Sequence, residues 1–398
     1  MNFVVYIHEY DITLFPSSSI STSNENLLNP LKIMFVLIDY VLLTFGVMVY
    51  TEHRYLRALN YLFRYLYFIS LVYELFISFK NGLSGAKLNM LFEYYVYFFL
   101  AISSQILVAR KANSIRQLNT YLMQIADIEV KQKLRRYAFC LFMFHWFCTT
   151  LGIVAWFYNI VAHGLEARLE NNRGYFFWIA DFRLGLAVCV IMRNLIAGIA
   201  REQWIHNSAI VYIYFAVAIE LIKHRSMSRL LIEDNDEHHN NHYHEKQLKK
   251  LIVIKRYFDR LKMEFESIFS VFPLMWFSYL FIGASGNIAY SAQNLQDPEM
   301  YAFLALFVRN LLVSFVIVFL INSFDYTNQV LCFDKCSTLF NELSNARNDE
   351  IAAITATQIE LGRQIAYTGG GLFQLTSGFI LSFVSGLVTF TVMFVQMS

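Results

Sequence analysis

Nine apolar stretches, each about as long as a membrane is thick, constrain this chain more than any other feature. A helix needs roughly 20 predominantly apolar residues to cross a hydrocarbon core of about 30 Å. Apolar side chains make up 57% of the chain, and charged side chains make up 16%, against about 25% in soluble domains. We therefore expect an all-α polytopic membrane protein with candidate spans at about 31–50, 61–80, 89–108, 138–162, 175–199, 205–223, 268–292, 301–322 and 372–396.

The charge balance argues against a nucleic-acid-binding protein, because 32 Lys and Arg against 30 Asp and Glu leave a net charge of only +2. The 4 Pro and 16 Gly favour long helices over turn-rich β structure. The five cysteines have no framework spacing, so no disulfide scaffold is expected. Segment 233–245 is rich in Asn and Asp, and we interpret it as a solvated loop rather than a metal site, despite its four histidines, His238, His239, His242 and His244. We expect no cofactor and no metal.

The distribution of basic residues predicts which stretches cross. Lys and Arg collect in cytoplasmic loops, and they are concentrated here in 109–137 and 223–262. If both blocks are cytoplasmic, an even number of spans separates them, whereas three candidates lie between. Stretch 175–199 carries Asp181, Arg183 and Arg193, and each charge near a helix centre costs about 2.5–3.5 kcal/mol on insertion. We expect it not to cross, and to form an external, partly inserted helix or a lead-in to 205–223.

The same parity argument extends to both ends of the chain. Loop 293–300 has no Lys or Arg, which suits the outside, so 301–322 returns the chain to the cytoplasm. Segment 323–370 is polar and helical in pattern, and 372–396 then exits, which predicts an extracellular C-terminus. Parity does not place 31–50, which contains Asp39: the total is eight spans if it crosses and seven if it does not.

The last stretch has a polar stripe. Gly378, Ser382, Ser385, Thr389 and Gln396 recur at spacings that place them on one face of a helix. Small and polar groups in a membrane helix face protein or water rather than lipid. Two interpretations stay open on periodicity alone: a close helix–helix contact made by small residues, or the wall of a pore in a symmetric oligomer.

Residues 389–397 of this stretch, TFTVMFVQM, resemble the terminal TYhhhhhQF signature of insect gustatory receptors, where h is an apolar residue. Phe390 replaces the Tyr, Met397 replaces the Phe, and Thr391 interrupts the apolar part. Segment 248–289 looks like the long helix that leads into the fifth span in that family, and 116–129 looks like its first intracellular loop. The resemblance covers the chain from about 60 onward. It favours seven spans, with a cytoplasmic N-terminus and 31–50 as a non-crossing helix.

The resemblance implies a ligand-gated, non-selective cation channel, similar to insect odorant receptors, in the plasma membrane of a sensory neuron. Four like or related subunits would surround the pore with their last helices, and a tastant or contact pheromone would open it. Gln396 and Met397 would lie at the extracellular constriction, with Thr389 and either Val392 or Met393 deeper and Ser385 and Ser382 on the same stripe. The last helix carries no acidic residue, which predicts weak discrimination among cations.

The expected organisation has three parts: a cytoplasmic N-terminal region (1–60), a six-span ligand-binding bundle (61–322) with cytoplasmic helical loops (109–137 and 223–267), and an anchor helix with the pore helix (323–398). An external small-molecule pocket would lie among the first six spans. Its reachable candidates are Trp156, Tyr158, Asn287 and Tyr290, although Trp and Tyr also populate the belts at both membrane surfaces.

Ionisable residues inside the spans tend to be functional. Here they are Asp39, Arg64, Glu74, Glu93 and Arg309. Two interpretations stay open for them: structural pairing inside the protein, or, for Arg64 and Arg309 especially, extension of the charged end toward the membrane surface. A secondary transporter would favour interrupted helices in two related halves, whereas the chain offers only Pro273 and Gly369–Gly371. A membrane enzyme would need an HExxH, paired-Asp or Ser/His motif in the spans, which the sequence lacks. A non-conducting chemoreceptor or auxiliary subunit remains the main alternative to a channel.

Overall fold

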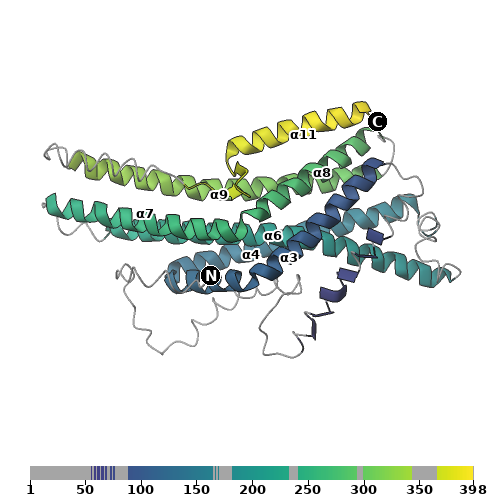
Figure 1. The fold of residues 1–398 in the computed structure, drawn as a ribbon, viewed down its shortest axis with the longest axis horizontal. Helices are drawn as coiled ribbons and strands as arrows, with labels where there is room; N and C mark the ends of the chain where they lie inside the picture. The colour runs from purple at the N-terminus through teal and green to yellow at the C-terminus, as the bar shows by residue number, and fades with distance from the viewer. Residues whose placement is uncertain are drawn as a thin grey trace.

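The computed structural model describes residues 88–164, 182–232, 241–293, 299–342 and 365–397, with single positions and short groups between 55 and 76 and at 166 and 169. The stretch 31–50, the residues Asp39 and Glu74, and the first histidines of segment 233–245 lie outside these residues. Within them the chain is built from long helices, which confirms the predicted all-α class (Figure 1). The bounds are α3 (Leu88–Ile125), α4 (Ile128–His163), α6 (Arg183–Ile232), α7 (Asn241–Phe269), α8 (Val271–Gln293), α9 (Glu299–Glu342) and α11 (Ser377–Met397), with a hairpin of β1 (Thr368–Gly369) and β2 (Phe373–Gln374).

Helices α3 and α4 run well beyond the predicted spans into the basic loop between them. Only Ala126 and Asp127 separate the two helices. The side chain of Asp127 caps α4 by accepting a hydrogen bond of 2.7 Å from the backbone N–H of Val130. At the other end, Gly164 adopts φ 74°, a left-handed conformation that stops the helix, and its N–H donates to the carbonyl of Val161. The predicted loop 109–137 is therefore almost entirely helical.

Helix α6 joins two of the apolar stretches that the sequence offered as separate candidates. It runs without interruption for 50 residues from Arg183, which at 1.5 Å per residue is about 75 Å. Most of 175–199 and all of 205–223 thus belong to one helix, so they do not form two antiparallel crossings. Of the two arrangements expected for 175–199, this is the one in which the stretch leads directly into 205–223.

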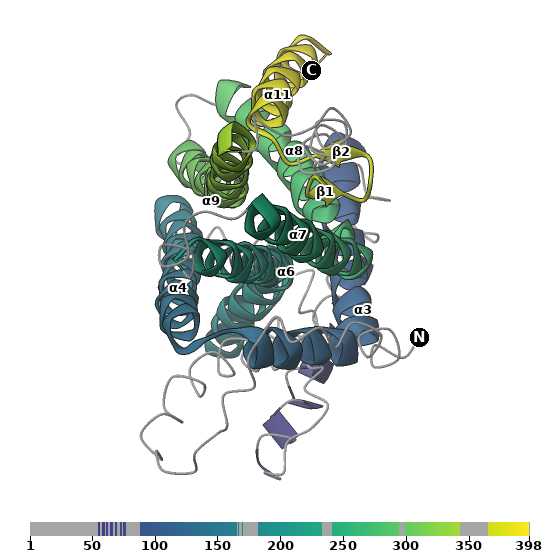
Figure 2. The ribbon, with the colours of Figure 1, turned by 90° about the vertical axis from the view of Figure 1, so that its left-hand side faces the viewer.

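The middle of α6 is the centre of the molecule. Viewed along the long axis, α6 lies inside a ring made by α3, α4, α7, α8 and α9 (Figure 2). Every residue from His206 to Ile222 is buried. A helix that is covered on all faces can be apolar all round, which is why this segment shows no amphipathic stripe. The core consists largely of this segment and the faces of the neighbouring helices that touch it.

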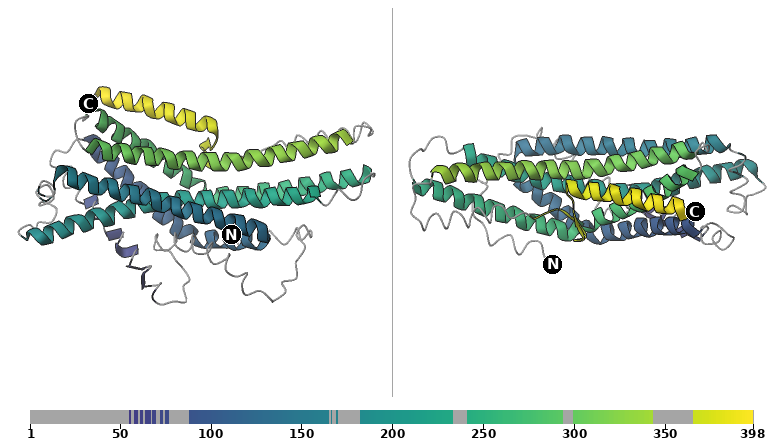
Figure 3. Two further views of the ribbon diagram at one scale, coloured as in Figure 1. Left: turned by 180° about the vertical axis from the view of Figure 1, so that it is seen from behind. Right: turned by 90° about the horizontal axis from the view of Figure 1, so that it is seen from above.

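Helices α7 and α8 are one helical path with a bend of 50° at Ser270. Pro273 explains the bend, because proline has no N–H to donate to the carbonyl four residues earlier, at Phe269, and its ring crowds that carbonyl. The bend lies where the β1–β2 hairpin approaches, and α11 then runs along α8 on the outside of the molecule (Figure 3). The four residues of β1 and β2 pair antiparallel, Thr368 with Gln374 and Gly369 with Phe373.

Two described helical stretches, Ile128–Ala155 and Phe307–Asn328, are each long and apolar enough to cross a membrane, and the bent pair Lys250–Phe269 and Val271–Gly283 would make a third if it counts as one span. These apolar helices indicate a membrane protein. The direction of each crossing and the number of spans stay predictions.

Candidate functional site

The predicted pore residues lie together on the outer side of α11. Ser382, Ser385, Thr389, Val392 and Gln396 are all exposed, as is Met393, and at 100° per residue they fall within an arc of about 100°. The side chain of Met397 lies outside the described residues. Ile380, Leu387 and Thr391 are buried on the opposite side, which packs on α8 and also touches α9. We call the exposed arc the outer face of α11.

Two hydroxyls of the outer face, those of Ser382 and Thr389, bond within their own helix. Ser382 Oγ donates to the carbonyl of Gly378 at 3.1 Å, and Thr389 Oγ1 donates to the carbonyl of Ser385 at 2.9 Å. Hydroxyl donors bonded in this way can stand beside water, a second helix or lipid without losing a hydrogen bond. The carboxamide of Gln396 has two N–H donors and an acceptor oxygen, which one bond to its own helix would not satisfy. It is therefore the outer-face group that most needs water or another protein group beside it.

Phenylalanines hold the inner side of α11 against α8. Phe277 contacts both Phe379 and Phe383 edge-on, with ring centroids 4.9 and 5.2 Å apart. Phe281 lies 5.0 Å from Phe390, the residue that stands where the gustatory-receptor signature has Tyr. The departure from the signature is therefore accommodated on the inner side of α11, among aromatic rings, and not on the outer face.

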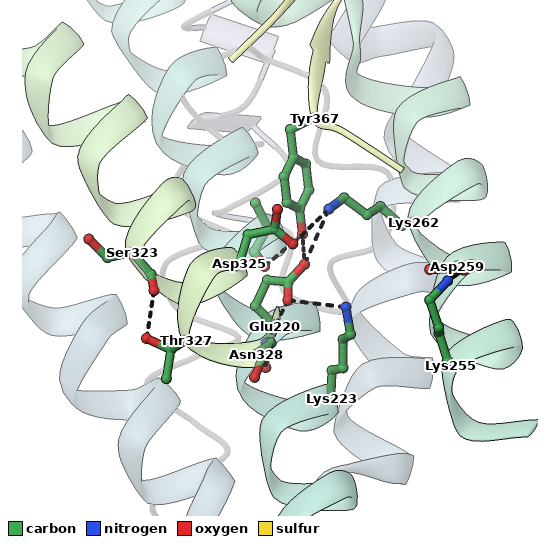
Figure 4. A network of polar contacts seen from close by, with 11 residues as sticks. Glu220, Lys223, Lys255, Asp259, Lys262, Ser323, Asp325, Thr327, Asn328 and Tyr367 are labelled. Atoms are coloured by element: carbon green, nitrogen blue, oxygen red, sulfur yellow. Dashed lines mark hydrogen bonds and ion pairs between the residues drawn. The ribbon is translucent and has the colours of Figure 1, made fainter. Parts of the chain in front are cut away.

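A buried network of charges lies below α11, where α6, α7 and α9 meet the chain that leads into the hairpin (Figure 4). Glu220 of α6 is 1% exposed, and Lys262 of α7 lies 3.4 Å from Glu220 Oε1 and 3.3 Å from Asp325 Oδ1 of α9. Asn328 Nδ2 donates to Glu220 Oε2 at 2.6 Å. Lys223 Nζ lies 3.9 Å from the same oxygen, so two cations balance two carboxylates. Buried charges are tolerated when they are paired and hydrogen-bonded in this way.

Tyr367, just before β1, completes the network. Its hydroxyl donates to Glu220 Oε1 at 2.9 Å, and Lys262 Nζ lies over its ring, 3.7 Å from the centroid. Burial, together with the negative charges of Glu220 and Asp325, raises the pKa of the Tyr367 hydroxyl well above its usual value. The phenol therefore stays protonated and remains a hydrogen-bond donor to the carboxylate.

Among the solved structures that share this arrangement are two of one protein, the insect olfactory receptor OR5 from Machilis hrabei, one of them in complex with eugenol. The TM-scores are 0.65 for the first and 0.67 for the complex, at 13% and 12% sequence identity. Each match covers 94% of this chain and 100% of the receptor. The chain has the fold of an insect olfactory receptor. No protein-family model and no curated protein matches the sequence.

The expected similarity to insect odorant receptors is therefore confirmed for the fold. The structure also places the predicted pocket residues. Tyr158 lies on α4 and is 43% exposed, which favours the alternative of a membrane-surface aromatic over a pocket wall. Trp156 lies on the same helix, and Asn287 and Tyr290 lie on α8, but their side chains are outside the described residues.

Arg309 corrects one expectation. It was expected to extend toward the membrane surface, but it is 2% exposed inside the olfactory-receptor fold. Its Nε and Nη2 donate to Asn310 Oδ1 at 3.1 and 2.9 Å. The guanidinium lies against Gly152 of α4, where an added Cβ would come within 2.6 Å of Nη1. A glycine on the facing helix therefore makes the space that allows this arginine to stay inside.

Sequence reasoning missed Glu220, Tyr367 and the hairpin. Glu220 is the single acidic residue between His206 and Ile222, and a lone carboxylate in an otherwise apolar stretch is a usable signal for a buried pair. Lys262 and Asp325 gave no such signal, because both stand in polar helical segments. Their burial depends on the neighbours that the olfactory-receptor fold brings to them.

Proposed function

We propose that this chain is one subunit of a ligand-gated cation channel of the gustatory-receptor kind. An external tastant or contact pheromone would bind in the six-span bundle (61–322) and favour the open state. The proposal rests chiefly on the outer face of α11, a polar face that no described part of its own chain covers. The olfactory-receptor fold supports it.

In the proposed assembly four copies, identical or related, stand around one axis in the plasma membrane and turn the outer face of α11 toward it. Ser382, Ser385 and Thr389 then line an aqueous path, and Gln396 and Met397 narrow it at the extracellular end. The path carries no acidic ring, so Na⁺ and K⁺ pass with little discrimination. The N-terminus is cytoplasmic and the C-terminus is extracellular. Residues 323–370, with the cytoplasmic ends of α6, α7 and α9, form the anchor.

A small organic molecule is the proposed ligand class. The related fold has been solved with eugenol bound, and apolar bundles with a few polar groups suit ligands of that kind.

Thiol accessibility of α11 tests the proposal directly. Single cysteines would replace Ser385, Thr389 and Gln396 on the outer face, and Leu387 on the buried side would serve as the matched control. We expect a charged, membrane-impermeant thiol reagent to reduce agonist-evoked current in the first three variants and to leave the Leu387→Cys variant unchanged. Wild-type channels treated in parallel control for Cys140, which is exposed.

The same recordings separate a pore subunit from a non-conducting chemoreceptor or an auxiliary subunit. If the chain reaches the cell surface and conducts only with a second subunit, and no outer-face cysteine affects the current, the pore assignment is wrong and the auxiliary alternative gains. Epitope tags on intact cells add an independent check, since the proposal needs an outside C-terminus and an inside N-terminus.

A further inference from the structure

The hairpin that precedes α11 is fastened to the bend between α7 and α8. The N–H of Gly370 donates to the carbonyl of Ser270, the residue at the bend, at 2.6 Å. The glycine run Gly369–Gly371 is thus bonded to a residue three positions before Pro273, although about a hundred residues separate the two interruptions in the sequence. Gly370 has φ 62°, and an added Cβ would lie 2.8 Å from Leu274, so glycine is required at this contact.

The first strand of the hairpin is bonded to the α7 side of the bend. The backbone N–H of Thr368 donates to Glu266 Oε2 at 3.1 Å, and the Thr368 hydroxyl donates to the same oxygen. Tyr212 of α6 donates to the other oxygen, Oε1, at 3.0 Å. The neighbouring Tyr367 bonds to Glu220, as described above. One carboxylate on α7 and one on α6 therefore hold two consecutive residues of the hairpin.

The second strand is packed on the α8 side. The ring of Phe373 stacks on Phe379 of α11, with centroids 4.2 Å apart and planes within 2° of parallel. The same ring meets Phe277 of α8 edge-on at 5.8 Å. The hairpin thus has hydrogen bonds to the helix before the bend and aromatic contacts to the helix after it, and it ends in α11.

This double attachment connects the bend to the direction of α11. If the angle between α7 and α8 changes, the two attachment points move relative to each other, and the short hairpin between them has to follow. We call the set Glu266, Ser270, Thr368, Gly370 and Phe373, with the Tyr367–Glu220 bond, the hairpin joint.

We propose that the hairpin joint sets the closed–open equilibrium of the pore by fixing the base of α11, with Thr368 and Tyr367 as positioning residues. This inference rests on the proposed channel function. It identifies the hairpin joint as the site where movement of the ligand-binding bundle is transmitted to the pore helix. The residues of the joint contact neither the ligand nor the ions.

The test removes single hydroxyls. Thr368→Val removes one donor to Glu266, and Tyr367→Phe removes the donor to Glu220, each with little change in shape. Matched controls are Thr327→Val and Tyr326→Phe on α9. Both residues are exposed, and the Thr327 hydroxyl donates to the carbonyl of Ser323 in its own helix. Whole-cell recordings would measure the agonist concentration for half-maximal current, the current without agonist, and the reversal potential.

We expect the agonist concentration for half-maximal current to shift about fivefold in each joint variant, and the current without agonist to change in the opposite direction, since a change in one two-state equilibrium moves both. The reversal potential should not move, because the ion path is untouched. The two control variants should match the wild type. Normal agonist response and normal basal current in Thr368→Val and Tyr367→Phe, at wild-type surface expression, would overturn the inference.

A second measurement does not depend on conduction. Spin labels at Val388 of α11 and Val271 of α8, both exposed, report the placement of α11 in purified protein that lacks the five native cysteines. We expect a broader distance distribution in the joint variants than in the controls, and an unchanged distribution would count against the joint. If the wild type carries no current at normal surface expression while the distribution still broadens, the channel proposal fails and the attachment of α11 by the joint stands.

Discussion

The middle of α6 and the whole of α11 are apolar helical segments of similar length with opposite surroundings. Residues 206–222 of α6 are buried on every side, and their one carboxylate, Glu220, is paired inside the protein. Helix α11 is buried on one side only, and its polar residues lie on the other. A lone charge within an apolar segment can thus indicate a partner in the same chain, whereas a stripe of small polar residues that the chain leaves uncovered indicates a partner outside it.

Removal of the buried charge in α6 should have the largest effect on stability. Glu220→Ala leaves Lys262 and Lys223 in the core beside Asp325 alone, and breaking a buried pair costs about 3–5 kcal/mol. Thermal unfolding of the detergent-solubilised protein, followed by size-exclusion fluorescence, should show a clear loss of stability. Glu129→Ala, at an exposed ion pair with Lys133, is the control, and an equal loss in both variants would contradict the assignment of Glu220 to a structural network.

The second-largest effect on stability should come from truncating aliphatic side chains, and it should differ between α6 and α11. Ile213→Ala in α6 removes a side chain that is 1% exposed, and such changes cost about 2–5 kcal/mol. Leu381→Ala in α11 removes one that is 75% exposed and should change stability by less than about 0.5 kcal/mol in the isolated subunit. A large loss for Leu381→Ala in the assembled protein, but not in the dissociated subunit, would show that a neighbouring subunit covers this position.

The C-terminal end of α6 offers a smaller and pH-dependent effect. Asp127 caps α4 and accepts hydrogen bonds from Arg225 and Arg229 of α6. Partial burial opposes ionisation, but the Val130 N–H, the Arg225 hydrogen bond and the Arg229 charge outweigh it and lower the pKa of Asp127. Asp127→Ala should cost about 1–2 kcal/mol.

The sign of the pH dependence follows from that lowered pKa. The stabilisation by Asp127 is complete above the unfolded value of about 3.9 and is lost as the pH falls through the folded value. The difference in unfolding temperature between wild type and Asp127→Ala should therefore be constant from pH 7 to pH 5 and should shrink below about pH 4. A difference that grew on acidification would have the wrong sign for a carboxylate held by arginines.

Changes on the outer face of α11 should affect stability least and conduction most. Gln396→Ala should change the free energy of unfolding of the subunit by no more than about 0.5 kcal/mol, as surface substitutions do. Met397→Ala is tested beside it, because the channel proposal puts both residues at the constriction. Under the channel proposal both alter or abolish the agonist-evoked current. Normal gating and permeation in both, at normal surface expression, would remove these residues from the pore.

The sequence was sufficient for the helical class and for the apolar stretches that fall within the described helices, because the length of an apolar run depends on local composition. It did not show which neighbouring stretches belong to one uninterrupted helix. The stretches 175–199 and 205–223 were separate by hydropathy, yet α6 passes through Arg193 and the polar residues after it without a break, since nothing there removes a backbone donor as Pro273 does. The charges lowered the hydropathy without ending the helix.

The candidate site was predictable where one helix carries it. The outer face of α11 follows from helical periodicity, and the structure places its described residues on one exposed arc. The buried network was not predictable, because Glu220, Lys262, Asp325 and Tyr367 come from four segments and each is ordinary in its own segment. The expectation for Arg309 failed for the same reason, since the space at Gly152 belongs to another helix.

The uninterrupted length of α6 has a consequence for how such a chain can diverge. Each inserted or deleted residue in a helix turns everything beyond it by about 100° and shifts it by about 1.5 Å. One extra residue near position 200 would rotate Glu220 away from Lys262 and Tyr367 while leaving the local composition unchanged. Related sequences that keep this fold should therefore accept many substitutions along α6 but hold the number of residues between its N-terminal end and Glu220 constant, so that length variation is confined to the connections between helices.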